Sequence, residues 1–541
     1  MKKQLLVLTL ALGATLSAKS QNPYLPMWEY IPDAEPYVFE DPDHPGRQRV
    51  YIYGSHDSMV SEYCGRELVT WSAPVDSLDR WRYEGVIFEV KRNARGEYMD
   101  GQQRGDVLYA PDVVETTDEA GRRCYYLYPN NQSGGRKGMV AKSYRPDGPF
   151  EVINWDPASP SKTIGVLGFD PAVFRDDDGR VYGYWGFGEP YVAELDPTTM
   201  ATVKPGTQVL HNYINGYKQP GIFRFFEASS IRKVKDKYIL IYSRMTGQNE
   251  FGLPTSNYTL AYAYSSSPMG PFTYGGTIID GRGRDLDAHG TPIFTATPNG
   301  NTHGSICEVN GRWWVFYHRQ TGLDEYSRQA MVAPIEVEVE EGEFGKVRIS
   351  EGAYTSEGFL TDGLPPLRRY SAGIACYYTG PKPAEHHWPR KTFHGSYVAP
   401  RRLPDDCPAM AKGCPAEFAY ALDVNHNPVV NNTDGSVVGY KYFNFSQTRG
   451  MSGLALSLRL IPQGLDATID IMLDSPRSET GGRLLGSMTL TKEMPCRSTL
   501  LEASLPALTA IGGKHALFLC FRSQQPGQSV CELLDLAFIP R

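Results

Sequence analysis

Five stretches of the sequence share one pattern: an apolar run holding an acid or a histidine, a polar turn, and an aromatic run. They are Asp33–Tyr53, Ala110–Tyr128, Asp170–Trp185, Glu227–Tyr242 and His303–Tyr317. Short runs rich in β-branched and aromatic residues, bounded by Gly, Asp, Asn or Pro, predict strands. Each unit has room for four strands, so the repeat predicts an all-β fold and a five-bladed β-propeller. An irregular β-sandwich is the alternative that this pattern leaves open.

Polar tips between apolar runs support the propeller. Asp176–Gly179, Lys235–Lys237 and Asn310–Gly311 each have the composition of a hairpin turn. The innermost strand of every propeller blade starts at the central channel. Residues at the starts of the five units are therefore expected to converge there.

The last third of the chain reads as a second all-β domain. After an acidic, Gly- and Pro-containing stretch at 341–365, which reads as a linker or closing strand, strand-like runs recur and predict a β-sandwich (jelly roll). The expected division is a signal peptide at 1–20, the propeller at 21–350, and a linker with the sandwich at 351–541. The runs are Val437–Phe445, Leu454–Leu460, Ala467–Leu473, His515–Phe521 and Leu533–Ile539.

The first twenty residues are typical of an export signal. Lys2 and Lys3 precede the short apolar run Leu5–Leu16, and the small residues Ala18 and Ser20 suit cleavage. A first buried strand or helix is the alternative. We expect a secreted or periplasmic protein without membrane insertion.

Charge and cysteine content exclude several classes. The formal net charge is -7 with no basic block, which argues against a nucleic-acid partner. The nine Cys residues form no zinc-binding spacing, and an exported chain permits disulfides. Cys407 with Cys414, and Cys520 with Cys531, are close enough in sequence to pair.

Three acids stand at equivalent places in the repeat. Asp33 lies in PDAEPYVF, Asp170 in FDPAVFRDDDG and Glu227 in FFEASS. Burial among apolar neighbours raises the pKa of a carboxyl. Each acid alone reads more readily as structural, but together they predict a convergent acid cluster.

These three runs, in this order, resemble glycoside hydrolase family 43 over roughly residues 22–350. The resemblance implies a five-bladed propeller and hydrolysis with inversion, which needs carboxyls about 6.5–9.5 Å apart. It also implies that Asp33 is the general base, that Asp170 tunes the acid, and that Glu227 is the general acid. Supporting runs are NPYLP (Asn22–Pro26), YGSHD (Tyr53–Asp57), APDVV (Ala110–Val114), HGSI (His303–Ile306) and FYHR (Phe316–Arg319).

Two registers compete for the base. The family often has Asp-Pro there, whereas Asp33 precedes Ala34 and Glu35 precedes Pro36. If the family's proline is aligned with Pro36, Glu35 is the base. If the acid is aligned without gaps through the run VYIYGSHD, Asp33 is the base. We choose Asp33. Positions two apart on a strand share a face, so Glu35 is also expected to face the central channel and to contact substrate.

Five further residues are candidates for binding substrate. His303 resembles the family's channel histidine, which sits near calcium or water, so it is also the candidate metal ligand. Arg319 could donate to sugar hydroxyls or pair with an acid, and Asp112 could accept from them. Trp185 and Phe226 could stack on sugar faces. Each could instead be a structural residue of the core, a turn or an ion pair.

The C-terminal runs Asp434–Phe445, Asp470–Pro476 and Cys531–Ile539 resemble a family 6 carbohydrate-binding module. Such modules are β-sandwiches, often with a structural calcium. The resemblance leaves open whether this domain binds sugar or only packs against the propeller.

We therefore expect an exo-acting, inverting α-L-arabinofuranosidase that acts on an oligosaccharide or plant-type polysaccharide without an organic cofactor. A β-xylosidase or a galactan-directed exo-hydrolase of the same family is the near alternative. A propeller that binds glycans without catalysis is the alternative of another class, and an extracellular scaffold is a third.

Overall fold

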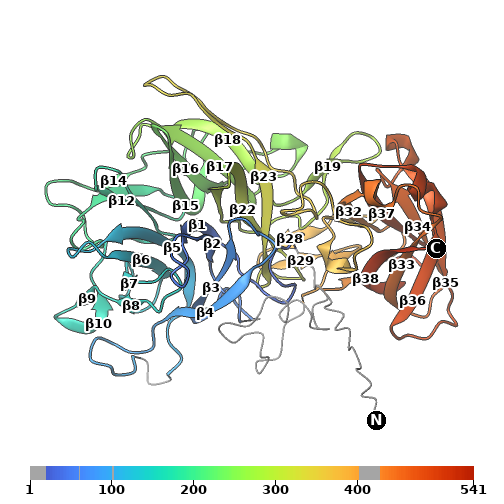
Figure 1. Ribbon diagram of the computed structural model, residues 1–541, viewed down its shortest axis with the longest axis horizontal. Coiled ribbons are helices and arrows are strands. Elements are labelled where there is room, and N and C mark those ends of the chain that lie inside the picture. The colour runs from blue at the N-terminus through green and yellow to red at the C-terminus, as the bar shows by residue number, and fades with distance from the viewer. Residues whose placement is uncertain (1–19, 60, 100–102, 401–426) are drawn as a thin grey trace, which may run out of the picture.

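The computed structural model describes residues 20–59, 61–99, 103–400 and 427–541, and these are almost entirely strands and loops. The expected signal peptide and the Cys407–Cys414 pair lie outside the described residues. Among the described residues, no helix is long and apolar enough to cross a bilayer. Figure 1 shows one body of small sheets on the left and a two-sheet body on the right.

The left-hand body is a five-bladed propeller, as the repeat predicts. The first two blades are four-stranded antiparallel sheets in chain order. Their strands are β1 (Glu35–Glu40), β2 (Gln48–Tyr53), β3 (Glu67–Pro74), β4 (Arg82–Glu89), β5 (Leu108–Thr117), β6 (Arg123–Asn131), β7 (Ala141–Ser143) and β8 (Glu151–Val152).

The next two blades also have four strands, and the fifth has three. A short pair, β9 (Trp155–Asp156) and β10 (Ser159–Thr163), separates the second blade from the third. The blade strands are β11 (Ala172–Arg175), β12 (Val181–Trp185), β13 (Tyr191–Leu195), β14 (Leu210–His211), β15 (Phe225–Val234), β16 (Lys237–Arg244), β17 (Thr259–Ser265), β18 (Thr273–Asp280), β21 (Ser305–Val309), β22 (Arg312–Gln320) and β23 (Arg328–Ile335).

Turn chemistry explains where these strands reverse. Lys235, between β15 and β16, and Asn310, between β21 and β22, both take the left-handed conformation that a tight hairpin needs. At the β11–β12 tip, Gly179 supplies the positive φ of 83°. The polar tips expected from the sequence are therefore turns in the structure.

The ring of blades is closed by the N-terminal segment. Each innermost strand contacts the next, and β21 of the last blade contacts β1 of the first. Beside the outer strand of the fifth blade, the Tyr24 amide donates to the Ala330 carbonyl. Asn22 donates to the Val332 carbonyl at 2.7 Å and accepts from the Val332 amide at 3.0 Å. The segment thus takes the place of the missing fourth strand.

The right-hand body is the expected sandwich of two sheets with an apolar core between them. One sheet runs β30-β31-β38-β33-β36, with β26 paired to β38, and the other runs β27-β32-β37-β34-β35. The strands are β26 (Tyr370–Ser371), β27 (Tyr377–Thr379), β30 (Tyr397–Val398), β31 (Val429–Val430), β32 (Val437–Asn444), β33 (Leu454–Pro462), β34 (Ala467–Leu473), β35 (Arg483–Leu490), β36 (Thr499–Ser504), β37 (Lys514–Ser523) and β38 (Cys531–Pro540).

The expected Cys520–Cys531 disulfide is wrong. Cys520 lies on β37 and Cys531 on β38, which belong to different sheets, and both thiols are free. The prediction relied on closeness in sequence, but the connection between the two strands crosses from one sheet to the other.

The stretch expected as a linker is packed. Its first strand, β25 (Val347–Ile349), pairs as a hairpin with β24 (Val337–Val339), which lies just before it. The Gly352 amide then donates to the Ile278 carbonyl at 2.7 Å, and the Phe359 ring lies edge-on to Trp314 with centroids 4.9 Å apart. This stretch therefore adds to the propeller's wall before the sandwich begins.

Candidate active site

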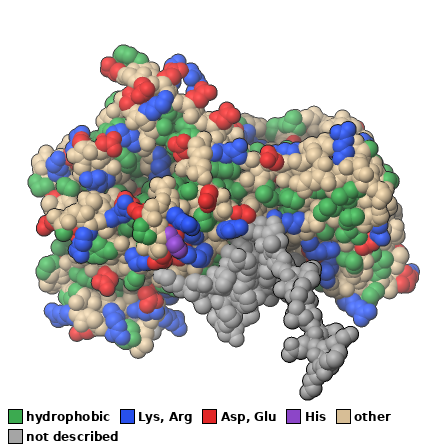
Figure 2. Space-filling view, viewed as in Figure 1, with side chains coloured by type: hydrophobic (Ala, Val, Ile, Leu, Met, Phe, Trp, Pro, Cys, Tyr) green, Lys and Arg blue, Asp and Glu red, His purple; other side chains and the backbone are tan. Residues whose placement is uncertain are grey.

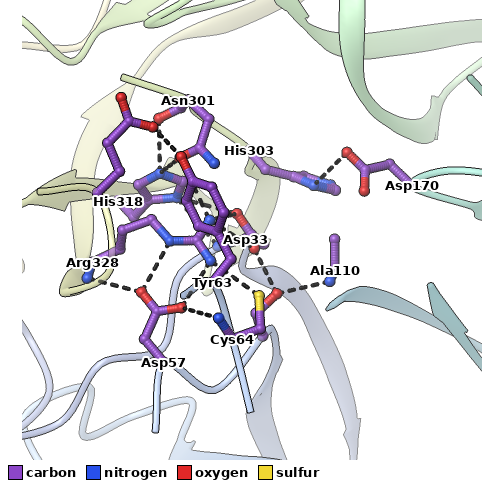
Figure 3. Close-up of polar contacts among 12 residues, drawn as sticks. Asp33, Asp57, Tyr63, Cys64, Ala110, Asp170, Asn301, His303, His318 and Arg328 are labelled. Atoms are coloured by element: carbon purple, nitrogen blue, oxygen red, sulfur yellow. Dashed lines mark hydrogen bonds and ion pairs between the residues drawn. The ribbon is translucent and has the colours of Figure 1, made fainter. Parts of the chain in front are cut away.

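A pocket of about 380 Å³ lies where the propeller's innermost strands begin. That volume is in the range of small-molecule sites. Asp33, Asp170 and Glu227 all line it, although they come from the first, third and fourth blades. The acid cluster expected from the repeat is therefore present, and Figure 3 shows Asp33 and Asp170 on either side of His303.

Backbone geometry aims the three acids. Asp33 and Asp170 precede their strands and both take left-handed backbone, with φ of 61° and 48°. Glu227 lies inside β15, where the pairing with β16 shifts register on both sides of it, and the next residue, Ala228, has φ of 67°. Bulges and left-handed residues re-aim side chains, and such backbone concentrates at functional sites.

Asp33 is held as a carboxylate. Burial is the largest single influence and raises the pKa of this carboxyl, but its charged and hydrogen-bonding neighbours, Arg328 foremost, together outweigh burial and keep the pKa below its usual value. Arg328 donates to both Asp33 oxygens at 3.1 and 3.2 Å, and the Ser55 hydroxyl donates at 2.6 Å. Asp57 anchors the other side of Arg328 at 2.8 Å (Figure 3). Asp33 is thus ready to accept a proton.

The neutral imidazole of His318 supports Asp33. Burial lowers the pKa of this imidazole to about 4. Its Nδ1 accepts from the Asp33 amide at 3.3 Å, so Nε2 carries the proton and donates to the Asn301 carbonyl at 3.0 Å. Arg328 is therefore the cation in direct contact with Asp33 at neutral pH.

Glu227 differs from Asp33 because its pKa is raised, not lowered. Burial, and then the neighbouring Asp170 carboxylate, raise its pKa well above the usual value. Burial also raises the pKa of Asp170, to about 6, while the Asn130 amide donates to it at 2.7 Å. At neutral pH, Asp170 is ionised and Glu227 carries a proton. The pocket thus holds a proton acceptor and a proton donor together.

His303 lines the pocket, as expected, and lies between two acids. Its Nδ1 lies 3.7 Å from Asp170 and its Nε2 lies 3.6 Å from Glu35. The Glu35 carboxylate and the charges of Asp170 and Asp33 raise its pKa to about 9 against the effect of burial. A charged His303 ties the acids together electrostatically.

The residues around His303 do not suit the expected metal role. Calcium takes six to eight oxygen ligands. Here Glu35 is paired with Arg232 at 2.8 Å and Asp170 accepts from Asn130. Among the described residues, no group of three or more His, Cys, Asp and Glu side chains could hold a metal ion.

Glu35 lies below the pocket and does not line it. It is 1% exposed, its oxygen accepts from the Arg232 guanidinium, and Ser230 donates to it at 3.1 Å. Burial raises its pKa, but Arg232 and His303 together outweigh burial and lower it. Asp33, not Glu35, therefore faces the cavity, and the expectation that Glu35 contacts substrate is wrong.

Three more expected sugar contacts lie elsewhere. Asp112 is buried between blades, where it accepts from the Tyr37 hydroxyl and from the Val173 amide, both at 2.6 Å. Trp185 packs in the core and stacks on Tyr191 with ring centroids 5.6 Å apart. Neither side chain lines the pocket.

Arg319 is the third of these corrections. It is 1% exposed and donates to the Gln329 side chain at 2.8 Å and to the Ala375 carbonyl at 2.9 Å. Neighbouring residues of a strand face opposite sides. His318 on the same strand points to Asp33, so Arg319 points away, towards the sandwich.

Phe226 does line the pocket, as expected, within a group of aromatic rings. The Phe187 ring lies 5.1 Å from Phe226 and from Phe169, centroid to centroid. Sequence reasoning missed Arg328, Tyr63, Glu325, His386 and Trp388, which also line the cavity. For Arg328 a signal existed, because its partner Asp57 ends the YGSHD run; the others lie in stretches without a motif.

A propeller whose central pocket pairs an ionised carboxylate with a protonated one has the machinery of a glycoside hydrolase. The chain belongs to glycosyl hydrolases family 43, whose model matches residues 41–341. This confirms the resemblance in the N-terminal part. The matched range begins after Asp33 and Glu35, so the geometry above distinguishes between these two.

Several known proteins are similar to this chain. A xylosidase/arabinosidase of Thermoclostridium stercorarium is 32% identical over 93% of this chain and 96% of its own length. An arabinoxylan arabinofuranohydrolase of Bacillus subtilis is 31% identical over 50% of this chain and 54% of its own. A solved β-xylosidase/α-arabinofuranosidase from a compost metagenome, in a calcium-free form with xylotriose, is 22% identical, with a TM-score of 0.42 over 61% of this chain and 97% of its own.

Proposed function

We propose that this protein is an exo-acting, inverting glycoside hydrolase that releases arabinofuranose or xylose from a plant-type polysaccharide such as arabinoxylan. The observation that carries the proposal is that Asp33, bound by the Arg328 guanidinium, and Glu227, buried beside Asp170, line one pocket, with the pKa of Asp33 lowered and that of Glu227 raised. The names of the similar proteins support the choice of sugars.

In the proposed mechanism, Asp33 accepts a proton from a water molecule. The oxygen of that water attacks the anomeric carbon as the bond to the leaving oxygen breaks. Glu227 gives its proton to the leaving oxygen, so the sugar departs with inverted configuration. Asp33 then carries a proton and Glu227 a negative charge, and exchange with solvent restores both.

The neighbouring groups hold these states before substrate arrives. Arg328 is foremost among the groups that lower the pKa of Asp33, whereas burial, and then the Asp170 carboxylate, raise the pKa of Glu227. Phe226 and its neighbouring rings form the apolar wall against which a sugar face packs. No step passes through a metal.

The export signal predicted at 1–20 supports a secreted or periplasmic location, where the enzyme would encounter polysaccharide. We keep the division into a propeller to residue 350 and a linker with sandwich from 351 as part of this proposal. A family 6 module-like role of the sandwich in binding sugar also stays a prediction.

The test is a set of aryl glycosides carrying arabinofuranose, xylose or galactose, with three variants. The wild type should release arabinofuranose or xylose. Glu227→Gln and Asp33→Asn should each lower kcat by 10² or more, since general acid and base catalysis each contribute about that much. Glu35→Gln should retain far more activity than Asp33→Asn, and the reverse order would make Glu35 the base. A folded wild type that cleaves none of the glycosides would support the binding-only alternative.

A further inference from the structure

A small hairpin of the C-terminal part reaches into the active-site pocket. It consists of β28 (Glu385–His387) and β29 (Arg390–Thr392), which pair only with each other and belong to neither sheet of the sandwich. Figure 1 shows it at the junction of the two bodies, beside the fifth blade. His386 and Trp388 from this hairpin line the pocket together with the catalytic acids.

The hairpin is fixed to the propeller by main-chain contacts. Arg390 forms a bridge with Asp324 in the loop between β22 and β23. The Lys391 amide donates to the Leu323 carbonyl at 2.9 Å, and the Lys391 ammonium donates to the Asp324 carbonyl at 2.7 Å. Lys391 is only 4% exposed, so this attachment is buried. The hairpin therefore presents its side chains to the pocket from a rigid base.

One of those side chains fixes a further carboxylate at the pocket wall. His386 Nε2 lies 2.5 Å from Glu325, whose other oxygen accepts from the Tyr63 hydroxyl. Burial raises the pKa of Glu325, but its neighbours together, with the bond from His386 first and the charge of Lys391 second, outweigh burial and lower it. Glu325 is therefore an acceptor for sugar hydroxyls, held in place by the hairpin.

Trp388 lies at the mouth of the same pocket. It is 70% exposed, whereas Asp33, Asp170 and Glu227 are 5–7% exposed. The acids therefore form the floor and Trp388 the rim. A flat apolar ring beside hydrogen-bond acceptors suits a pyranose, which presents an apolar C–H face and polar edges. A sugar that meets Trp388 lies outward of the sugar that the acids cleave off.

We propose that the β28–β29 hairpin forms the subsite for the sugar on the leaving side of the scissile bond, with Trp388 as its stacking platform and Glu325, positioned by His386, as its hydroxyl acceptor. This rests on the proposed function and specifies it: the substrate class is a β-linked xylo-oligosaccharide, or the xylose to which an arabinose is attached, and not an aglycone of any shape.

Binding is tested first, apart from turnover. Xylotriose is titrated by calorimetry into Glu227→Gln and into Glu227→Gln with Trp388→Ala. Loss of the ring should weaken binding about tenfold, and Trp388→Phe should recover most of it, since stacking contacts are worth about a factor of ten. Phe344→Ala, which removes an 88% exposed ring outside the pocket, is the control and should change nothing. Equal affinity with and without Trp388 would overturn the proposal.

Turnover then separates this subsite from the reaction itself. Xylobiose and arabinofuranosyl-xylotriose have a sugar aglycone, whereas the matching glycosyl fluorides have none. Trp388→Ala and Glu325→Gln should lower kcat/KM about tenfold on the oligosaccharides and less than twofold on the fluorides. Equal losses on both kinds of substrate would overturn the subsite. A wild type that hydrolyses neither kind would overturn the proposed function, while the xylotriose titration would still decide the subsite.

Discussion

Arg328 sets the charge of the proposed base. It spans Asp33 and Asp57, and all three side chains are buried. Arg328→Lys keeps a charge but cannot bridge both carboxylates, so the pKa of Asp33 should rise. Because activity requires ionised Asp33, the acid limb of the kcat/KM profile should move to higher pH.

The matched control for that change is Arg319→Lys. Arg319 is as deeply buried, but it donates to an amide side chain and to carbonyls, not to carboxylates. The Arg319→Lys variant should have a lower midpoint of thermal unfolding and an unchanged acid limb of the kcat/KM profile. An acid limb that stays put in Arg328→Lys would contradict the role given to Arg328.

Asp170 governs the other limb of the profile. Activity requires protonated Glu227 and is lost as pH rises through its raised pKa. Asp170→Asn removes the anionic neighbour, so the pKa of Glu227 should fall and the alkaline limb should move to lower pH. The pH dependence of kcat/KM on an aryl glycoside measures this, and a limb that moves upward would refute the assignment.

At the scale of elements, the strand pattern and hairpin tips were predictable because they follow from local composition. The acids were predictable because they stand at the start of three of the five units. The predictions that failed depended on which face of a strand a side chain takes: Arg319 and His318 are neighbours on β22, yet only His318 points to Asp33. The sequence pattern also carries no sign of a long-range contact such as that of the hairpin with residues 323–325.

The N-terminal segment closes the propeller through few contacts, and Asn22 is central among them. Its side chain donates to the Val332 and Thr355 carbonyls and accepts from the Val332 amide, with no exposed surface. Asn22→Ala leaves buried groups unpaired and should lower the free energy of unfolding by about 2–4 kcal/mol. Denaturant titration measures this, with the exposed Gln525→Ala as a control that should change it by less than about 0.5 kcal/mol.

At the scale of the whole molecule, propeller and sandwich share a core. Met27 and Ala296 of the propeller pack in the same apolar cluster as the sandwich strands, and Arg319 donates across the junction to Ala375. Calorimetry should therefore show one cooperative unfolding transition. Two well-separated transitions would contradict a shared core.

The surface agrees with a neutral substrate. Figure 2 shows acidic and basic side chains interspersed over the visible face, and the net charge of the chain is -7. Such a surface offers no extended field for a polyanion. Recognition then depends on the pocket and its rim, where the two bodies meet.

In the proposed mechanism, Asp33 and Glu227 act on opposite faces of the sugar in a single displacement. Proton NMR of the reaction at early times, before mutarotation, tests it most directly. The first sugar released by the wild type should have the anomeric configuration opposite to that of the substrate. First appearance of the retained anomer would contradict the mechanism.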